Sequence, residues 1–260
     1  MKNLLALLVL IIHVPIQAQE SSQQRIITLS PHAAELAYFA GGEDRLIGVS
    51  AFSDFPESAK TLPLVGDVNG FDRELLLKLK PDLVIAWKQS LDSNDVAWLQ
   101  KESFRLFLSD PMSLDAIADE IKRLGEILNT QSFAQQSIEK MEQARIELQE
   151  IASARQRPIR VIHQLWNSPL MALTDTSMVS AVLSLCGIET PVHVENRLSA
   201  TLSKEQMYTA EIDAIIVDDK GRIEAVNPNG VAVIRVDTLK LHRASPRMLE
   251  SALELCRNID

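Results

Sequence analysis

The chain has 260 residues, of which 46% are hydrophobic and 23% charged, as in an ordinary globular protein with a sizeable core. Its net charge of −9 argues against nucleic acid as a partner, because such proteins need basic surface to neutralise phosphates. The net charge does not exclude a small-molecule ligand.

The N-terminus has the pattern of a secretory signal. Lys2 precedes an apolar run over residues 4–12, and Ala18 offers a small residue at a cleavage site. A membrane anchor is the alternative, but a span needs about 20 apolar residues. Residues 1–18 are therefore predicted to be a signal peptide. No cysteine adjoins the cleavage site, so we expect a soluble mature protein in a bacterial periplasm or an equivalent space.

Short apolar runs alternate with helical patterns over residues 19–131, which form a predicted N-terminal lobe. This alternation favours βα units and a parallel sheet. Predicted strands are 25–29, 46–49, 83–86 and 105–108, and predicted helices are 31–40, 72–79, 94–101 and 113–128.

The alternation stops at residues 132–155, where one helical stretch contains no glycine or proline. Apolar residues recur at helical spacing along it, at Ile138, Met141, Leu148 and Ile151. At 1.5 Å per residue the helix spans about 35 Å, the length of a small lobe. We predict a rigid connector between two lobes; a surface helix within one larger sheet is the alternative.

Residues 156–260 form a predicted C-terminal lobe with the same alternation. Predicted strands are 160–165, 214–218 and 231–236, and predicted helices are 177–185, 203–209 and 245–257. Segment 71–85 is matched by 202–216, and a helix ending at Gly41 before strand 46–49 is matched by one ending at Gly187 before 191–194. Two matches in the same order predict duplicated lobes. The predicted fold class is α/β, with two βα lobes, each around a parallel sheet, joined by one long helix.

Familiar catalytic and nucleotide-binding motifs are absent from the sequence, so we do not expect an enzyme or a cofactor. Glu74 and Glu205 each lie two residues after a helix N-cap, Asp72 and Ser203. Taken alone, either carboxylate would be explained by its favourable interaction with the dipole of its own helix. Together they put one exposed carboxylate on each lobe, which suits docking to a two-fold symmetric, basic partner.

Aromatic residues follow the predicted strands at three places, Phe52, Trp87 and Trp166. Side chains beyond the carboxyl ends of parallel strands face the ligand crevice of open α/β sheets. His32 follows a strand in the same way and could reach a cleft. Packing in the core or under loops is the alternative for each residue.

The histidines of the mature chain allow a second interpretation, in which they meet at a metal ion. They are His32, His163, His193 and His242, and their spacing carries no signature of a site. We expect no metal. Arg243, just before the last helix, could contact an acidic or amide-bearing ligand or form a surface salt bridge.

The two cysteines, Cys186 and Cys256, are predicted to form a disulfide, because exported proteins with an even count usually pair them. Two buried thiols are the alternative. A metal pair would need closer spacing.

Four motifs resemble the periplasmic cobalamin-binding proteins of ABC importers: residues 25–31, 48–56, 80–87 and 243–247. Haem- and siderophore-binding relatives share the first three. The resemblance implies two lobes on a long backbone helix, a ligand between them and little hinge closure. It also implies that Glu74 and Glu205 dock onto arginines of the membrane permease, that Cys186 and Cys256 are paired, and that Phe52, Trp87 and Arg243 contact ligand.

Two positions depart from this family. Val68 replaces a tryptophan of the first lobe, and Ser199–Thr201 lack the tryptophan of the second. Trp166, with Met171, is a candidate to compensate from another loop, and His32 is a further candidate for ligand contact. We expect a monomeric periplasmic protein that captures cobalamin or a related corrinoid and delivers it to an ABC importer. The same fold binding haem or a ferric siderophore is the first alternative, and a histidine-dependent metal-binding protein is the second.

Overall fold

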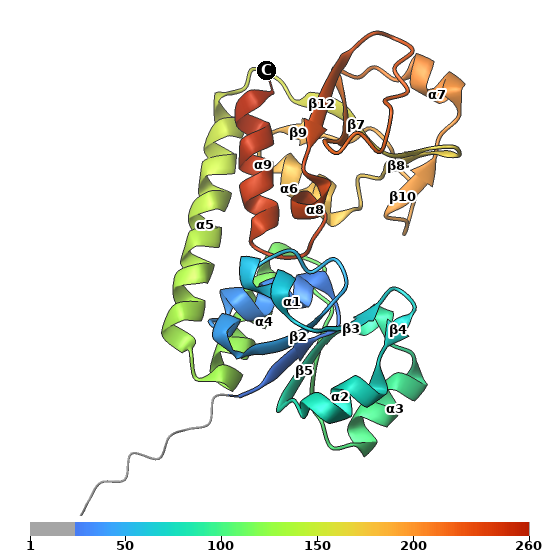
Figure 1. The fold of residues 1–260 in the computed structure, drawn as a ribbon. Helices are drawn as coiled ribbons and strands as arrows, with labels where there is room; N and C mark the ends of the chain where they lie inside the picture. The colour runs from blue at the N-terminus through green and yellow to red at the C-terminus, as the bar shows by residue number, and fades with distance from the viewer. Residues whose placement is uncertain (1–23, 260) are drawn as a thin grey trace, which may run out of the picture.

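Two α/β lobes are stacked along one long helix, α5 (Gln131–Ala154), in the computed structural model (Figure 1). The structure describes residues 24–259, so the predicted signal peptide over residues 1–18 lies outside the described residues. Both lobes lie on the same side of α5, with the N-terminal lobe below the C-terminal lobe in this view. The predicted fold class is confirmed.

The N-terminal lobe is built on a six-stranded sheet in the order β4-β3-β2-β1-β5-β6, parallel except for the β3–β4 pair. Its central strands β1 and β5 are buried apart from Trp87 at the end of β5, which explains why they are apolar runs in the sequence. Its strands are β1 (Ile26–Thr28), β2 (Leu46–Ser50), β3 (Leu64–Asp67), β4 (Gly70–Phe71), β5 (Leu83–Trp87) and β6 (Arg105–Ser109). Its helices are α1 (Pro31–Phe39), α2 (Arg73–Leu79), α3 (Ser93–Lys101) and α4 (Leu114–Leu128).

The C-terminal lobe has a sheet in the order β10-β8-β7-β11-β12, with β9 on β7. Strands β7, β11 and β12 are parallel, whereas β8 and β10 are antiparallel additions. Its strands are β7 (Ile159–Asn167), β8 (Leu170–Leu173), β9 (Ile188–Glu189), β10 (Ser199–Thr201), β11 (Ala214–Asp218) and β12 (Ala232–Val236). Its helices are α6 (Met178–Ser184), α7 (Lys204–Thr209), α8 (Thr238–Leu241) and α9 (Arg247–Asn258).

The two sheets share one plan around their first strands. In the N-terminal lobe β1 pairs in parallel with β2 and β5, and in the C-terminal lobe β7 pairs in parallel with β9 and β11. The predicted duplication is therefore present in the topology. Residues 191–194, which the sequence comparison matched with strand 46–49, do not form the corresponding strand, because pairing with β7 occurs at β9. Pro191 has no N–H to donate to a ladder, so the strand ends before it.

Helix α5 connects the lobes through a shared core. Met141 and Leu148 on α5 belong to one buried cluster with Leu36 of α1, Leu124 of α4 and Leu249 of α9. The stripe predicted for α5 is thus its contact face with both lobes.

None of the helices within residues 24–259 is both long enough and apolar enough to cross a membrane.

Helices α4 and α5 approach each other closely at one glycine. A Cβ placed on Gly125 would lie 2.5 Å from the Cβ of Ala134, so a larger residue would push the two helices apart. The chain turns between them at Asn129, which has a left-handed conformation with φ 57°.

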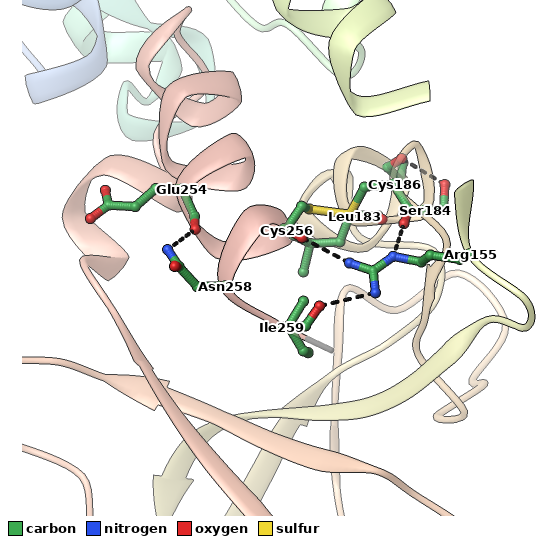
Figure 2. The surroundings of a disulfide bond; sticks show 9 residues. Arg155, Leu183, Ser184, Cys186, Glu254, Cys256, Asn258 and Ile259 are labelled. Carbon is green, nitrogen blue, oxygen red and sulfur yellow. Dashed lines mark hydrogen bonds between the residues drawn. A yellow bond between two sulfur atoms is a disulfide. The ribbon is translucent and has the colours of Figure 1, made fainter. Parts of the chain in front are cut away.

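The disulfide between Cys186 and Cys256 is formed and joins the end of α6 to α9 (Figure 2). Both cysteines are buried. Arg155, just after α5, points its guanidinium at the same place and donates to the carbonyl oxygens of Cys186, Cys256 and Ile259 at 2.8–3.0 Å. The disulfide therefore ties α9 to the segment after α6, and the hydrogen bonds of Arg155 tie both to the end of α5.

Truncation of the connector's buried face is expected to destabilise the whole protein. Leu148→Ala removes a fully buried side chain and should lower the free energy of unfolding by about 2–5 kcal/mol. Ile146→Ala is the matched control on the same helix, because Ile146 is 40% exposed, and it should change stability by about 1 kcal/mol or less. Urea denaturation checks both, and equal losses would contradict a connector that packs through one face.

Candidate functional site

A cavity of about 470 Å³ opens at the carboxyl ends of β1, β2 and β5. This is the place where open α/β sheets bind ligands. Its walls are mainly apolar with a few polar groups at the edges. The lining residues are Leu29, Ser30, Pro31, Ser50, Ala51, Phe52, Gly66, Asp67, Val68, Gly70, Phe71, Trp87, Gln89, Ser90 and Leu91.

Phe52 and Trp87 line this cavity, as their positions at the carboxyl ends of β2 and β5 predict. The Phe52 side chain is 74% exposed and that of Trp87 is 40% exposed. Val68, at the position where the family has a tryptophan, is 88% exposed on the same wall. So much accessible apolar surface around a hollow is typical of a binding site rather than of a core.

His32 lies beneath Trp87 and is held by a chain of hydrogen bonds. The two rings meet edge to face with centroids 6.0 Å apart. Ser109 donates its hydroxyl to Glu120 at 2.6 Å, so its oxygen accepts from Nε2–H of His32 at 3.1 Å, and Nδ1 accepts from Ser30. Desolvation and the nearby charge of Arg243 lower the pKa of His32 to about 4. The imidazole is therefore neutral and fixed in one tautomer.

A neutral cluster of two carboxylates and two guanidinium groups joins the lobes. Glu35 of α1 is fully buried, and one of its oxygens accepts from Arg243 at 2.8 Å and from Arg247 at 2.7 Å. The other oxygen accepts from the hydroxyl of Ser245. Sequence reasoning missed this role for Glu35; the available signal was a single charge within the apolar run of α1.

Arg243 points into this cluster rather than into the cavity. Its side chain is 10% exposed, pairs with Asp54 and donates to the backbone carbonyl of Phe52 at 2.9 Å. Burial alone would raise the pKa of Asp54, but the hydrogen bond and charge of Arg243 outweigh it and hold that pKa below its usual value. Of the two alternatives for Arg243, the structure shows a salt bridge, which is buried and not at the surface.

The remaining predicted contacts lie elsewhere. Trp166, near the end of β7, is 55% exposed on the C-terminal lobe. Glu74 and Glu205 are exposed in the first turns of α2 and α7, each two residues after its N-cap. The structure thus gives the two glutamates equivalent positions in the two lobes.

The four histidines do not converge. His163 and His242 meet with their Nε2 atoms 3.1 Å apart, whereas His193 pairs with Asp175 and His32 with Ser109. Among residues 24–259 no group of three or more His, Cys, Asp and Glu side chains is placed to hold a metal ion. These four histidines are therefore not arranged around a common point, as the metal-binding alternative requires.

Comparison with known proteins agrees with this geometry. The family model described as periplasmic binding protein matches residues 26–238. The chain belongs to the periplasmic binding protein family. It is 34% identical over 260 residues to a vitamin B12-binding protein of Yersinia pestis (strain Pestoides F), with 97% of this chain and 91% of that protein covered.

Solved structures of periplasmic binding proteins show the same fold. The vitamin B12 binding protein BtuF of Vibrio cholerae aligns with a TM-score of 0.75 at 28% identity, over 91% of this chain and 98% of that chain. The heme binding protein HutB of Vibrio cholerae aligns with a TM-score of 0.79 at 20% identity, over the same shares. The second likeness shows the fold alone.

A second cavity of about 410 Å³ lies on the C-terminal lobe, between β7, β10 and α7, and sequence reasoning did not anticipate it. It is lined by Arg160, Ile162, Pro191, Val192, His193, Val194, Ala200, Thr201, Leu202, Gln206, Thr209, Ala210 and Glu211. Ala200, at the site of the family's second tryptophan, therefore lines a different hollow from that of Phe52 and Trp87.

Acidification is expected to destabilise this binding protein through its buried histidine. Burial, with a contribution from His242, lowers the pKa of His163 well below 6.5, whereas the unfolded chain takes up the proton near pH 6.5. Its stabilising contribution is thus fully present above pH 6.5 and is lost as the pH falls, by about 1.4 kcal/mol per pH unit. Urea denaturation at pH 7, 6 and 5 should show a smaller pH dependence for His163→Gln. If the free energy of unfolding changed equally with pH in the variant and the wild type, His163 would not be the source of the acid sensitivity.

Proposed function

We propose that the protein captures cobalamin or a related corrinoid and delivers it, chemically unchanged, to an ABC importer. The observation that carries the proposal is the apolar cavity at the strand ends with Phe52, Val68 and Trp87 exposed around it. A large flat ligand would cover these side chains and bury their apolar surface. Identity of 34% with a vitamin B12-binding protein over most of the chain supports the same choice.

The size of the cavity also suits a shared site. About 470 Å³ lies within the usual range for small-molecule pockets, and a corrinoid is larger than that. The N-terminal lobe would therefore hold one face of the ligand, and the C-terminal lobe, where Trp166 is exposed, would cover the other.

Haem is the second candidate, and the cavity of the N-terminal lobe, as lined by the described residues, offers it no axial ligand. Haem proteins hold the iron through His, Cys, Met or Tyr. The cavity walls, in the part of the chain that the structure describes, contain none of these residues. His32 is close by, but its Nε2–H donates to Ser109. A corrinoid whose cobalt already carries its axial ligands needs no such group.

Titration with cyanocobalamin tests the ligand. The purified protein should bind it at micromolar concentration or below, and Trp87→Ala should weaken binding about tenfold through lost stacking area. Tyr208→Ala is the matched control, because Tyr208 is an exposed aromatic on α7 away from the cavity. Isothermal titration calorimetry with cyanocobalamin and with haemin measures the affinity for each ligand. No binding of cyanocobalamin at micromolar concentration would overturn the corrinoid proposal.

Glu74 and Glu205 support the delivery step. Each is exposed at the second position of its helix, and neither forms an ion pair with any residue from 24 to 259. Two free carboxylates at matching places on two lobes fit the two halves of a membrane permease that presents arginine or lysine. We infer that the mature protein works in the periplasm after removal of residues 1–18.

Charge reversal tests docking separately from ligand binding. The double variant Glu74→Lys/Glu205→Lys should abolish uptake of labelled cobalamin in cells that depend on this protein, because like charges would then face each other, while ligand affinity stays unchanged. The control is Glu150→Lys/Glu254→Lys, which makes the same charge change at exposed sites on α5 and α9. Unimpaired uptake, or a fall in ligand affinity instead, would remove the docking role.

A further inference from the structure

Phe52 holds a backbone conformation that bulky residues rarely adopt. Its φ is 65°, in the left-handed region. Such a conformation persists only where surrounding contacts fix it. Because the Phe52 ring forms part of the cavity wall, whatever fixes this backbone also decides where the ring stands.

The N-terminal lobe fixes the residues on either side of Phe52. The Ala51 N–H donates to the Gly66 carbonyl at 2.7 Å, and the Ser53 N–H donates to the Ser50 carbonyl at 3.3 Å. The Ser50 and Ser53 hydroxyls lie 3.2 Å apart. These contacts close the turn but leave the Phe52 carbonyl for another donor.

That donor comes from the other lobe. Arg243 donates through Nη2 to the Phe52 carbonyl at 2.9 Å, and its Nη1 pairs with Asp54 and with Glu35. A guanidinium suits this task because its planar set of donors reaches several oxygens at once. One side chain of the C-terminal lobe thus holds the loop at residues 52 and 54 against α1.

We propose that Arg243 is a positioning residue, which shapes the ligand cavity from the opposite lobe by fixing Phe52. The inference rests on the proposed function in taking this cavity as the ligand site. Arg243 does not line the cavity, and both of its terminal nitrogens already donate to the N-terminal lobe. Arg243 would affect ligand affinity only through the position of the Phe52 ring.

Arg247 provides a matched control. It also donates to Glu35, at 2.7 Å, and its guanidinium lies 4.3 Å from the centre of the Phe55 ring. Its contacts go to α1 and Phe55 rather than to Phe52 or Asp54. Arg243→Lys and Arg247→Lys each weaken the same junction between the lobes, but only Arg243→Lys releases the Phe52 loop.

Hydrogen exchange of the ligand-free protein tests the positioning directly. Arg243→Lys should speed exchange at the amides of residues 51–54 about tenfold, as expected when one charge-assisted hydrogen bond is lost. Strand β5 should not change, and Arg247→Lys, which alters a contact with Phe55 but none with residues 51–54, should leave those four amides as in the wild type. Asp54→Asn, which keeps both arginines, is the second variant and should give a smaller increase. Unchanged exchange in both loop variants would overturn the proposal.

Ligand affinity separates positioning from direct contact. Phe52→Ala should weaken cyanocobalamin binding about tenfold in the wild type. In the Arg243→Lys background it should weaken binding less than about threefold, because the ring is already displaced. If the two effects multiply, Arg243 acts independently of Phe52 and the proposal fails. If the wild type does not bind cyanocobalamin, the corrinoid proposal fails, while the exchange measurement still decides whether Arg243 fixes the loop.

Discussion

The arrangement of the two lobes depends on one buried carboxylate. Glu35 is fully enclosed and would be strongly destabilising if left without partners. Arg243, Arg247 and Ser245 satisfy both of its oxygens, and all three come from the other lobe. With Asp54 the cluster is neutral, two carboxylates against two guanidinium groups. Removing one member of such a buried set typically destabilises a protein by about 3–5 kcal/mol, so separating the lobes at this point would carry a large free-energy cost.

This ionic junction acts together with an apolar one. The core cluster continues from Leu36 and Leu124 through Leu148 of α5 to Leu249 of α9, so the two lobes share buried surface as well as charge. A hinge between them would have to expose both. The geometry therefore favours lobes that keep this arrangement without ligand, so that the site is largely preformed. Preorganisation of this kind lowers the cost of ordering the site when ligand binds.

Much of the fold could be predicted from the sequence because its signals are local. Apolar runs such as β5 and the stripe of α5 follow directly from strand and helix periodicity. The short strands β3, β4, β8, β9 and β10 were missed, because segments of two to four residues carry little periodic pattern. The positions of Phe52 and Trp87 followed from strand ends, which is a rule of topology. The Glu35 cluster could not be foreseen in this way, because its partners are more than 200 residues away in the chain.

The two departures from the family have different physical meanings in this structure. Val68 stands exposed on the wall that carries Phe52 and Trp87, so a smaller side chain there widens the same cavity and removes stacking area from the ligand. Ala200 lies in β10 and packs against the C-terminal lobe's own core, beside a separate hollow. Loss of an aromatic at position 200 therefore does not reshape the Phe52 cavity. Within the Phe52 cavity, the change in stacking area therefore comes from Val68 and not from Ala200.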